Sequence, residues 1–176
     1  MYCGGSDMAL KKIVIDDFTV RAHDQWANKW FLLTCGDFAK GHFNTMTVAW
    51  GSFGTMWGKP FAQVVVRPTR YTFEFMEKYD SFTLNALSEE YRKAKQIMGT
   101  RSGRDRDKVT ESGLTPIAST EVASPSYREA NLIVECKKIY ADDFKPENFK
   151  HPDIKSCYPL KDYHRFYFGE IIAVLS

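Results

Sequence analysis

Paired cysteines, long apolar runs and an excess of charge of one sign are all missing from this sequence. Four cysteines are present, and no two of them form a CxxC pair: Cys3, Cys35, Cys136 and Cys157. This spacing argues against a zinc knuckle or a thioredoxin-type redox centre, so we expect reduced, mostly structural thiols. The N-terminus has no basic run followed by an apolar region, and no apolar stretch is long enough to span a bilayer. We therefore expect a soluble, cytoplasmic protein without a membrane partner.

The balance of charges argues against binding of a nucleic acid or another large polyanion. The 24 basic and 22 acidic residues are mixed along the chain and give a net charge of +2. Binding to a nucleic acid or a membrane surface requires a broad basic field, so any anion site must be local. At 176 residues, with 44% hydrophobic and 15% aromatic side chains, the chain can fill one core. We expect residues 1–23 to form a lead-in with a first strand, and residues 24–176 to form a single domain.

The common catalytic signatures are missing as well. Gly58 and Lys59 resemble the end of a P-loop, but Phe53 stands where that loop needs a glycine. No GxGxxG motif follows a strand, which argues against a Rossmann dinucleotide site. Ser52 lacks the GxSxG spacing of a nucleophile elbow. The four histidines include no i, i+4 pair, so we expect no metal site.

Hydrophobic periodicity and turn residues predict many short strands. The expected strands are 12–20, 28–34, 46–50, 61–67, 81–87, 131–140 and 165–175. The expected helices are a short one ending at 77 and capped by Thr69 or Thr72, one at 88–98 and one at 105–111. We expect a long turn at 51–60, an irregular segment at 113–126 and a polar loop at 142–159. This pattern predicts a mainly β fold with inserted helices, barrel-like rather than doubly wound.

Two segments carry more polar chemistry than a core requires. In 66–72, Arg67 and Arg70 flank a proline beside two hydroxyls and an expected helix N-terminus, which are groups that hold a phosphate monoester. Surface ion pairs are the alternative, and for this segment alone they are favoured. In 44–51, threonines alternate with Met46, Val48 and Trp50, so the strand could offer a flat heteroaromatic ligand both a wall and hydroxyls. A half-buried strand with Trp50 in the core is favoured for that segment alone.

Taken together, the segments resemble the flavin reductase-like, FMN-binding split-barrel family, and most closely its flavoredoxin-type branch. The resemblance runs from roughly residue 24 to the C-terminus in successive blocks: Asn-Thr-Met-Thr-Val-Ala-Trp-Gly (44–51), Val-Val-Arg-Pro-Thr-Arg-Tyr-Thr (65–72), Phe-Thr-Leu-Asn (82–85), Gly-Thr-Arg-Ser-Gly-Arg-Asp (99–105) and His-Arg-Phe-Tyr-Phe-Gly-Glu-Ile (164–171). It implies a single-domain FMN-binding split β-barrel with Greek-key topology. It also implies a homodimer of such barrels with FMN held near the subunit interface.

The resemblance further implies which residues hold FMN. Residues expected along the isoalloxazine ring are Asn44, Thr45, Met46, Thr47, Val48, Ala49 and Trp50. Residues expected at the ribityl phosphate are Arg67, Arg70, Tyr71 and Thr72. Residues expected to border the flavin or to close its phosphate or ring edge are Asn85, Ala86, Leu87, Arg101 and Ser102, with lysine at position 101 expected as readily as arginine. Residues expected to face the flavin or nicotinamide pocket are His164 and Tyr167.

The function that the resemblance implies is a flavin reductase that transfers hydride from NADH or NADPH to the flavin. No residue is assigned a catalytic role, because in such an enzyme the protein supplies orientation and electrostatics. The first alternative is a flavoredoxin-like carrier that keeps FMN and exchanges electrons with a redox partner protein, without NAD(P)H turnover of its own. A flavin-storing or regulatory module ranks below it. A barrel that binds single-stranded nucleic acid ranks last, because the sequence lacks a basic stripe.

Overall fold

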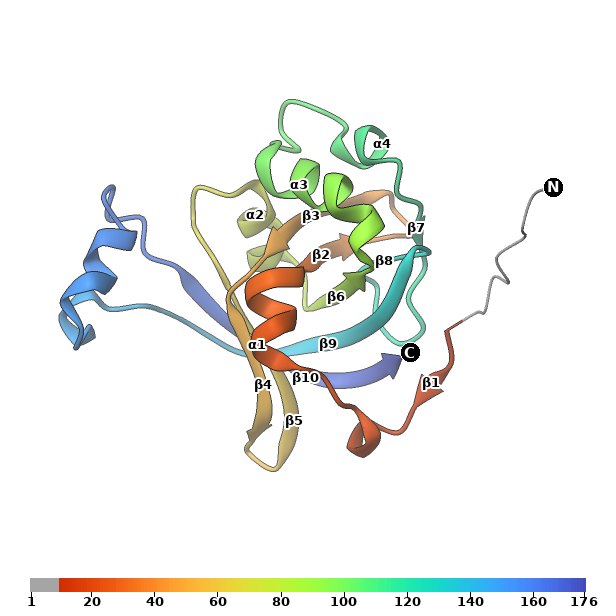
Figure 1. The fold of residues 1–176 in the computed structure, drawn as a ribbon, viewed down its shortest axis with the longest axis horizontal. Helices are drawn as coiled ribbons and strands as arrows, with labels where there is room; N and C mark the ends of the chain where they lie inside the picture. The colour runs from red at the N-terminus through yellow and green to blue at the C-terminus, as the bar shows by residue number, and fades with distance from the viewer. Residues whose placement is uncertain (1–9) are drawn as a thin grey trace.

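One antiparallel sheet organises the computed structural model, which describes residues 10–176 (Figure 1). Within those residues eight strands are joined in the order β3, β2, β6, β9, β10, β5, β4, and β1 pairs with β10 as well. Their bounds are β1 Lys12–Ile13, β2 Phe31–Asp37, β3 His42–Val48, β4 Gly51–Met56, β5 Lys59–Val66, β6 Ser81–Leu87, β9 Ala130–Asp143 and β10 Arg165–Leu175. A separate pair consists of β7 Pro116–Ile117 and β8 Ser126–Tyr127. The first nine residues of the expected lead-in lie outside the described part of the chain.

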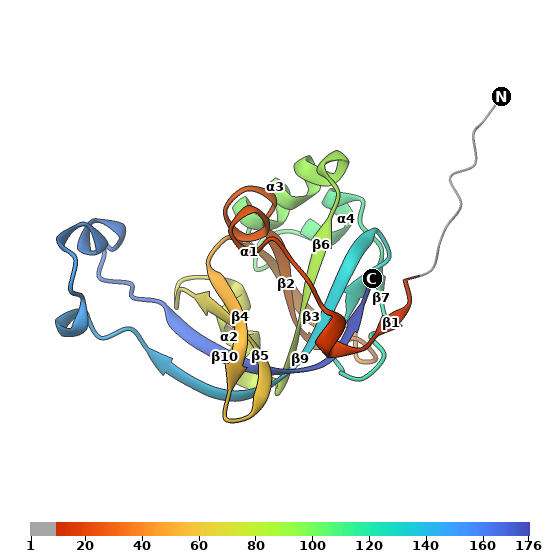
Figure 2. The ribbon, with the colours of Figure 1, turned by 60° about the horizontal axis from the view of Figure 1, so that its bottom comes forward.

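Short helices occupy the connections between strands. The α-helices are α1 Ala22–Asp24, α2 Tyr71–Lys78, α3 Arg92–Thr100 and α4 Lys108–Ser112, and a π-helix at Gln25–Lys29 continues α1. Short 3-10 helices lie at Ile15–Asp17, Glu89–Tyr91, Pro146–Asn148 and Pro152–Cys157. Helices α3 and α4 pack together on the β3 and β2 side of the sheet (Figures 1 and 2). None of the helices in residues 10–176 has the length and hydropathy that a bilayer crossing requires.

Strands β2 and β6 form the centre of the core. Both are buried along nearly their whole length, which requires cover on both faces of the sheet. Phe31, Leu33, Phe82 and Leu84 are completely buried there. Each such side chain stabilises the fold by about 1.5–3 kcal/mol relative to exposure. The expected fold class, mainly β with inserted helices, is confirmed.

Strands β9 and β10 extend beyond the body of the domain and carry a projecting segment, residues 144–164, which we call the arm (Figure 1). The two strands pair from Arg165 opposite Asp143 to the end of β10. A register shift follows Phe168, and at Gly169 a Cβ would lie only 2.6 Å from the Phe82 ring. Glycine is therefore required where the long strand crosses the core.

The expected long turn at 51–60 is wrong. This segment contains β4, which pairs antiparallel with β5, and the connection between them is only the two-residue turn Trp57-Gly58. Both turn residues have positive φ angles, 54° and 68°, as in a type I′ hairpin. The glycines that suggest a turn instead allow close packing, because a Cβ on Gly51 would lie 2.4 Å from the ring of Trp26.

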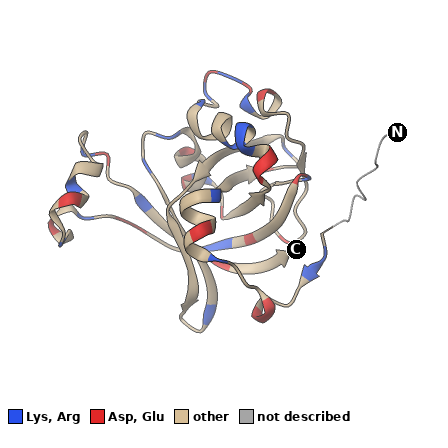
Figure 3. Ribbon diagram, in the orientation of Figure 1, with Lys and Arg blue, Asp and Glu red and all other residues tan. Residues whose placement is uncertain are grey.

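Other expected boundaries also differ from the structure. The strand expected from residue 28 begins at Phe31, because the chain before it is helical. Neither expected threonine caps α2, and the Thr72 hydroxyl instead accepts a hydrogen bond from the Asn44 amide at 2.7 Å. The expected strand at 12–20 is reduced to β1 followed by a 3-10 turn, and the expected helix at 88–98 begins as a 3-10 turn. Basic and acidic residues are mixed over the elements (Figure 3).

Candidate functional site

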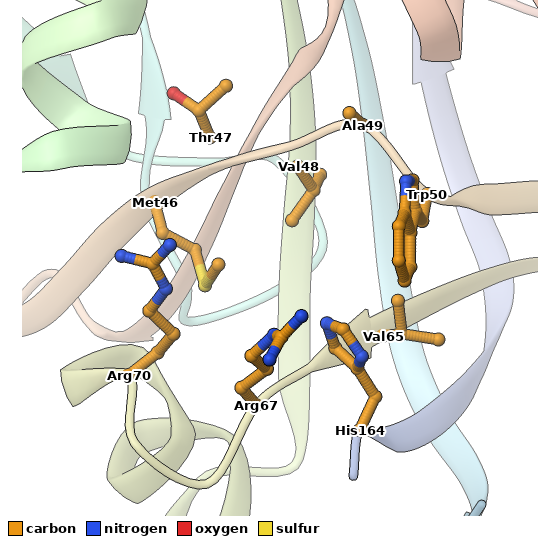
Figure 4. Close-up of a pocket in the computed structure, with 9 residues that line it drawn as sticks. All are labelled: Met46, Thr47, Val48, Ala49, Trp50, Val65, Arg67, Arg70 and His164. Atoms are coloured by element: carbon orange, nitrogen blue, oxygen red, sulfur yellow. The ribbon is translucent and has the colours of Figure 1, made fainter. Parts of the chain in front are cut away.

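Two neighbouring cavities lie between β3, the start of α2 and the end of α3. The first, which we call the strand cavity, has a volume of about 190 Å³ (Figure 4). Its lining residues are Met46, Thr47, Val48, Ala49, Trp50, Val65, Arg67, Arg70 and His164. The second, which we call the cationic cavity, has a volume of about 90 Å³. Its lining residues are Met46, Thr69, Arg70, Tyr71, Thr72, Met98, Gly99, Thr100, Arg101, Ser102 and Lys108. The cavities share the lining residues Met46 and Arg70, so they adjoin along one side of β3.

Trp50 stands at the solvent edge of the strand cavity, just after the end of β3. Its side chain is 48% exposed, so it does not belong to the core. Its ring centroid lies 5.1 Å from that of His164, and the two rings are tilted by 46°. An indole that is about half exposed can still stack against a flat ligand.

The hydroxyl of Thr47 is directed away from the strand cavity. It donates to the carbonyl of Lys95 in α3 at 2.5 Å and so ties the helix to the strand. Figure 4 agrees, since Thr47 points outward while Arg67, Arg70 and His164 point inward. The polar side chains of this cavity are therefore two guanidinium groups and one imidazole.

Arg67 is held in place by the arm. Its Nη1 donates to both carboxylate oxygens of Asp162 at 2.9 and 2.8 Å, and its Nη2 donates to the carbonyl of Cys157 at 2.8 Å. Its guanidinium also lies 5.1 Å from the ring centroid of Tyr158. Arg67 lowers the pKa of Asp162 through this hydrogen bond. The side chain thus closes the cavity rim with a paired charge.

His164 is a neutral wall of the strand cavity. Burial first, and then the positive charge of Arg67, lower its pKa to about 4. Its Nδ1 lies 2.8 Å from the hydroxyl of Tyr158, whose own pKa is raised by burial. At neutral pH the two groups can form this hydrogen bond without adding charge to the cavity.

Arg70 is the exposed charge that the two cavities share. Within the described residues it forms no ion pair, and its Nη1 donates to the carbonyl of Gly99 at 3.3 Å. No carboxylate lines the cationic cavity, where Arg101 and Lys108 add two further positive charges. Guanidinium, ammonium and hydroxyl groups are the side chains that proteins use to bind phosphate and other anions.

Lys108 is a site residue that the sequence reasoning missed. It is only 4% exposed, and its Nζ donates to the carbonyls of Met98 and Arg101 at 3.3 and 3.4 Å. Burial first, and then the charge of Arg70, lower its pKa to about 8. A sequence signal existed, because Asp107 caps a helix whose first residue is this lysine. A cation is disfavoured at a helix N-terminus unless something else holds it there.

Several expected site residues do not line either cavity. Asn44 and Thr45 are buried and hold β3 to its neighbours, Asn44 through Thr72 and Thr45 through the hydroxyl of Tyr127 at 2.7 Å. The expected residues of β6 are also buried in the core: Asn85, Ala86 and Leu87. The oxygen of Asn85 accepts from the backbone amide of Tyr127 at 3.0 Å. In this chain these side chains are part of the core beneath the two cavities and do not line them.

Tyr167 is likewise directed into the core. It is 1% exposed, and its hydroxyl donates to Glu77 at 2.7 Å. The alternation of β10 places it on the inner face, whereas His164 precedes the strand and is free to reach the cavity. The tyrosine beside His164 is therefore Tyr158 of the arm, which the sequence reasoning missed.

A third cavity, of about 580 Å³, lies between the arm and the body and begins at Trp50. Its lining residues are Trp50, Asp142, Asp143, Phe144, Lys145, Asn148, Phe149, Ile154, Cys157, Tyr158 and Phe166. We call it the arm cavity. Five of its eleven lining residues are aromatic, and Phe149 stacks on Tyr158 with centroids 5.8 Å apart. Its volume lies within the range that is usual for small-molecule sites, and through Trp50 it adjoins the strand cavity.

Comparison with known proteins places this geometry in a family. The model for the flavin reductase like domain matches residues 25–175. An uncharacterized protein of Pyrococcus abyssi is 28% identical over 112 residues, which cover 62% of this chain and 53% of that protein. The chain thus spans about half the length of this curated relative.

Solved structures share the fold. Flavoredoxin of Desulfovibrio vulgaris (Miyazaki F) superposes with a TM-score of 0.63 at 24% identity, covering 82% of this chain and 67% of that one. An FMN-binding domain of a flavin reductases-like enzyme from Shewanella baltica OS155 gives 0.68 at 16%, covering 95% and 76%. A putative flavin reductase with a split barrel domain from Shewanella frigidimarina gives 0.65 at 20%, covering 91% and 75%. The expected split-barrel fold is confirmed.

Proposed function

The chain belongs to the flavin reductase-like domain family, and from this premise we propose that it binds FMN and works as a flavin reductase that oxidises NADH or NADPH. One observation carries the proposal. The strand cavity adjoins the cationic cavity at Met46 and Arg70, so room for a flat ring lies next to a cluster of positive charges. FMN combines these two features in one molecule, a planar ring system and a terminal phosphate.

The residues present fit both ends of FMN. At the ring end, Met46 and Val48 offer apolar contact, and Trp50 and His164 form a neutral aromatic wall. At the phosphate end, a charge of about −1.5 to −2 at neutral pH would meet Arg70, Arg101 and Lys108 without a competing carboxylate. The Shewanella baltica neighbour, which is described as an FMN-binding domain, supports this assignment.

The redox chemistry, transfer of a hydride from a reduced nicotinamide, would be supplied by the cofactor. The protein's own part is to bind, orient and exclude water. Arg70 would fix the phosphate end, and the Arg67–Asp162 pair holds the rim of the cavity rigid. Trp50 faces the strand cavity on one side and the arm cavity on the other, so a second reactant would be guided against the same ring.

A flavoredoxin-like electron carrier is the alternative function. It would need the same FMN site, and the named relatives include a flavoredoxin. The arm cavity favours the reductase, because a carrier that meets only a protein partner has no use for a 580 Å³ chamber beside its cofactor. A carrier would keep its flavin and consume neither NADH nor NADPH.

We infer in addition that the chain works as a homodimer. Exposed aromatic side chains gather on β9, β10 and the β4–β5 turn, including Tyr140 at 44% and Trp57 at 61% exposure. Trp57 is held at a φ of 54°, which is unfavourable for a bulky residue, and its ring lies 5.9 Å from that of Tyr140. A surface of this kind is typical of association sites.

Two measurements on the purified protein test the proposed function. A retained flavin gives absorbance bands near ~450 nm, and NADH or NADPH oxidation with added FMN gives turnover. Flavin binding with rapid oxidation supports the reductase. Flavin binding without oxidation of either nucleotide would overturn the reductase and favour the electron carrier. Failure to bind FMN would refute both.

A further inference from the structure

We propose that Lys108 is a specificity-determining residue of the cationic cavity, binding the phosphate of FMN as an ammonium ion. In that role it makes the affinity for the phosphorylated flavin, and not for riboflavin, decline as the solution becomes alkaline. The proposal deepens the FMN site proposed above and rests on it.

The position of Lys108 supplies the first reason. It begins α4, is almost fully buried, and lines the cationic cavity together with Arg70 and Ser102. Its two hydrogen bonds go to backbone carbonyls at 3.3 and 3.4 Å, both longer than usual for an ammonium donor. An ammonium group has three N–H donors, so one remains for a ligand in the cavity.

A second buried lysine in the same region makes the difference clear. Lys95 is fully buried, and its Nζ donates to the carbonyls of Lys29 and Leu87 at 2.9 and 3.2 Å. It also pairs with the carboxylate of Glu89 at 3.5 Å. Lys95 therefore has three acceptors, including a countercharge. Within residues 10–176 Lys108 has two acceptors and no ion pair, which leaves its charge to be balanced by a ligand.

The charged groups around Lys108 leave the cavity positive. Arg70 at the start of α2 and Arg101 after α3 line the same cavity. The carboxylate of Asp107, next in the chain, accepts from the amide and hydroxyl of Thr110 at 3.1 and 2.7 Å. Glu74 is paired with Arg104, and Glu111 with Arg106. Asp105 and Asp107 line a neighbouring cavity of about 770 Å³ that Lys108 also borders, and neither carboxylate lines the cationic cavity.

This environment sets the direction of the pH effect. Without a ligand, burial and the charge of Arg70 hold the pKa of Lys108 at about 8. The ammonium form is therefore favoured at pH 7 and the amine at pH 9. A bound phosphate dianion favours the ammonium form and must raise this pKa. Binding above pH 8 then requires uptake of a proton, so affinity falls as pH rises. Between pH 7 and pH 9 the loss is about tenfold.

The test compares FMN and riboflavin at pH 7 and pH 9 by fluorescence titration of the flavin-free protein. Riboflavin shares every ring ionisation with FMN and lacks only the phosphate, so it isolates the phosphate end. For the unaltered protein we expect the FMN dissociation constant to rise about tenfold between the two pH values and the riboflavin constant to stay level. This comparison requires no variant, so it does not depend on whether a mutant folds.

Variants then test whether Lys108 causes the pH dependence of FMN affinity. Lys108→Met keeps the length of the side chain and removes its charge, so we expect FMN to bind about ten- to a hundred-fold more weakly at pH 7, with no further loss at pH 9. Arg70→Ala should retain a pH-dependent loss and shift it to higher pH, because a cation near Lys108 is removed. Lys95→Met is the matched control, in which FMN keeps its pH dependence. Thermal unfolding of each variant checks the fold.

The outcomes separate this proposal from the proposed function. If riboflavin and FMN both bind but the FMN affinity does not change between pH 7 and pH 9, Lys108 does not have this role, while the flavin site stands. The same holds if Lys108→Met retains the slope. If neither flavin binds the unaltered protein, the proposed function fails, and this inference fails with it.

Discussion

The hydroxyl of Tyr158, on the arm, lies 2.8 Å from Nδ1 of His164, at the base of β10. Burial acts on both groups in the direction of the neutral form, raising the pKa of the phenol and lowering that of the imidazole to about 4. The contact lies within the arm and holds His164, the arm's last residue, against the strand cavity without placing a titrating charge there near pH 7. The free-energy cost of keeping His164 neutral should appear only at acidic pH.

The first prediction concerns this cost. In the unfolded chain His164 has an ordinary pKa of about 6.5, so below that pH the unfolded state binds a proton that the folded state excludes. Stability contributed by the neutral imidazole is therefore present above pH 6.5 and is lost as the pH falls toward 4, by up to about 3 kcal/mol. We expect His164→Gln to lose less stability than the unaltered protein between pH 6.5 and 4.5, measured by urea unfolding.

His23 provides the matched control for this experiment. It is exposed on α1 and lines neither the strand cavity nor the cationic cavity. His23→Gln should therefore follow the pH dependence of the unaltered protein. If the His23 and His164 variants show the same acid loss, the neutral state of His164 contributes nothing measurable.

The second prediction separates the two roles that a tryptophan can have here. Trp50 is nearly half exposed, whereas Trp26 is 5% exposed and packs on Phe31 at 4.8 Å. We expect Trp50→Ala to weaken FMN binding by about 1–3 kcal/mol, since an aromatic stacking surface is lost. We expect Trp26→Ala to reduce the free energy of unfolding by about 3–5 kcal/mol, since a core aromatic is lost. Flavin titration and thermal unfolding of both variants measure the contrast, and unchanged flavin affinity in Trp50→Ala would remove it from the site.

Much of the strand pattern could be predicted from the sequence, because alternation and turn residues are local. Strand β6 has the bounds expected from its residues, Ser81–Leu87. Strand β4 was missed for an equally local reason. Its glycines are typical of turns, and only the distant Trp26 packed against Gly51 explains why they form a strand. Contacts between distant parts of the chain therefore determine that this segment is a strand, which its composition does not indicate.

The site was harder to predict, because its chemistry depends on which distant groups meet. The sequence indicates that Arg67 and Arg70 are special, but Asp162, which lies 95 residues beyond Arg67, determines that Arg67 is the paired one. The face on which Tyr167 lies depends on the register of β10 within the sheet. Lys108 lines the cavity only because α4 packs on the end of α3. Of these relationships, only the position of Lys108 after the capping Asp107 leaves a local pattern in the sequence.

The third prediction tests the inferred dimer. Obligate dimer interfaces bury ~2,000 Å² or more, with aromatic residues contributing a large share. We expect light scattering to give twice the chain mass of 20.3 kDa. Trp57→Ser and Tyr140→Ser should each weaken association, about thirtyfold if the lost contact is worth 2 kcal/mol. Val14→Ser, at a 66% exposed residue away from this surface, should have no effect. A monomer at micromolar concentration would overturn the inference.

The last prediction distinguishes the two arginines. Arg70 is exposed and has no ion-pair partner among residues 10–176, whereas the guanidinium of Arg67 is bound to Asp162 and to the carbonyl of Cys157. A charge-assisted hydrogen bond to phosphate is worth about 1.5–3 kcal/mol, so Arg70→Ala should weaken FMN binding about ten- to a hundred-fold. Riboflavin affinity should barely change, and the difference should shrink as salt rises.

Arg67→Ala should have the opposite profile, with a smaller loss of FMN affinity and a larger loss of stability. Removing it leaves the Asp162 carboxylate unpaired and releases the arm, so the free energy of unfolding should fall. Asp162→Asn should loosen the arm similarly while leaving the Arg67 charge in place, so it serves as the control. Flavin titrations and urea unfolding of all three variants provide the comparison. A greater loss of FMN affinity in Arg67→Ala than in Arg70→Ala, or equal losses for FMN and riboflavin in Arg70→Ala, would place the phosphate outside the cationic cavity.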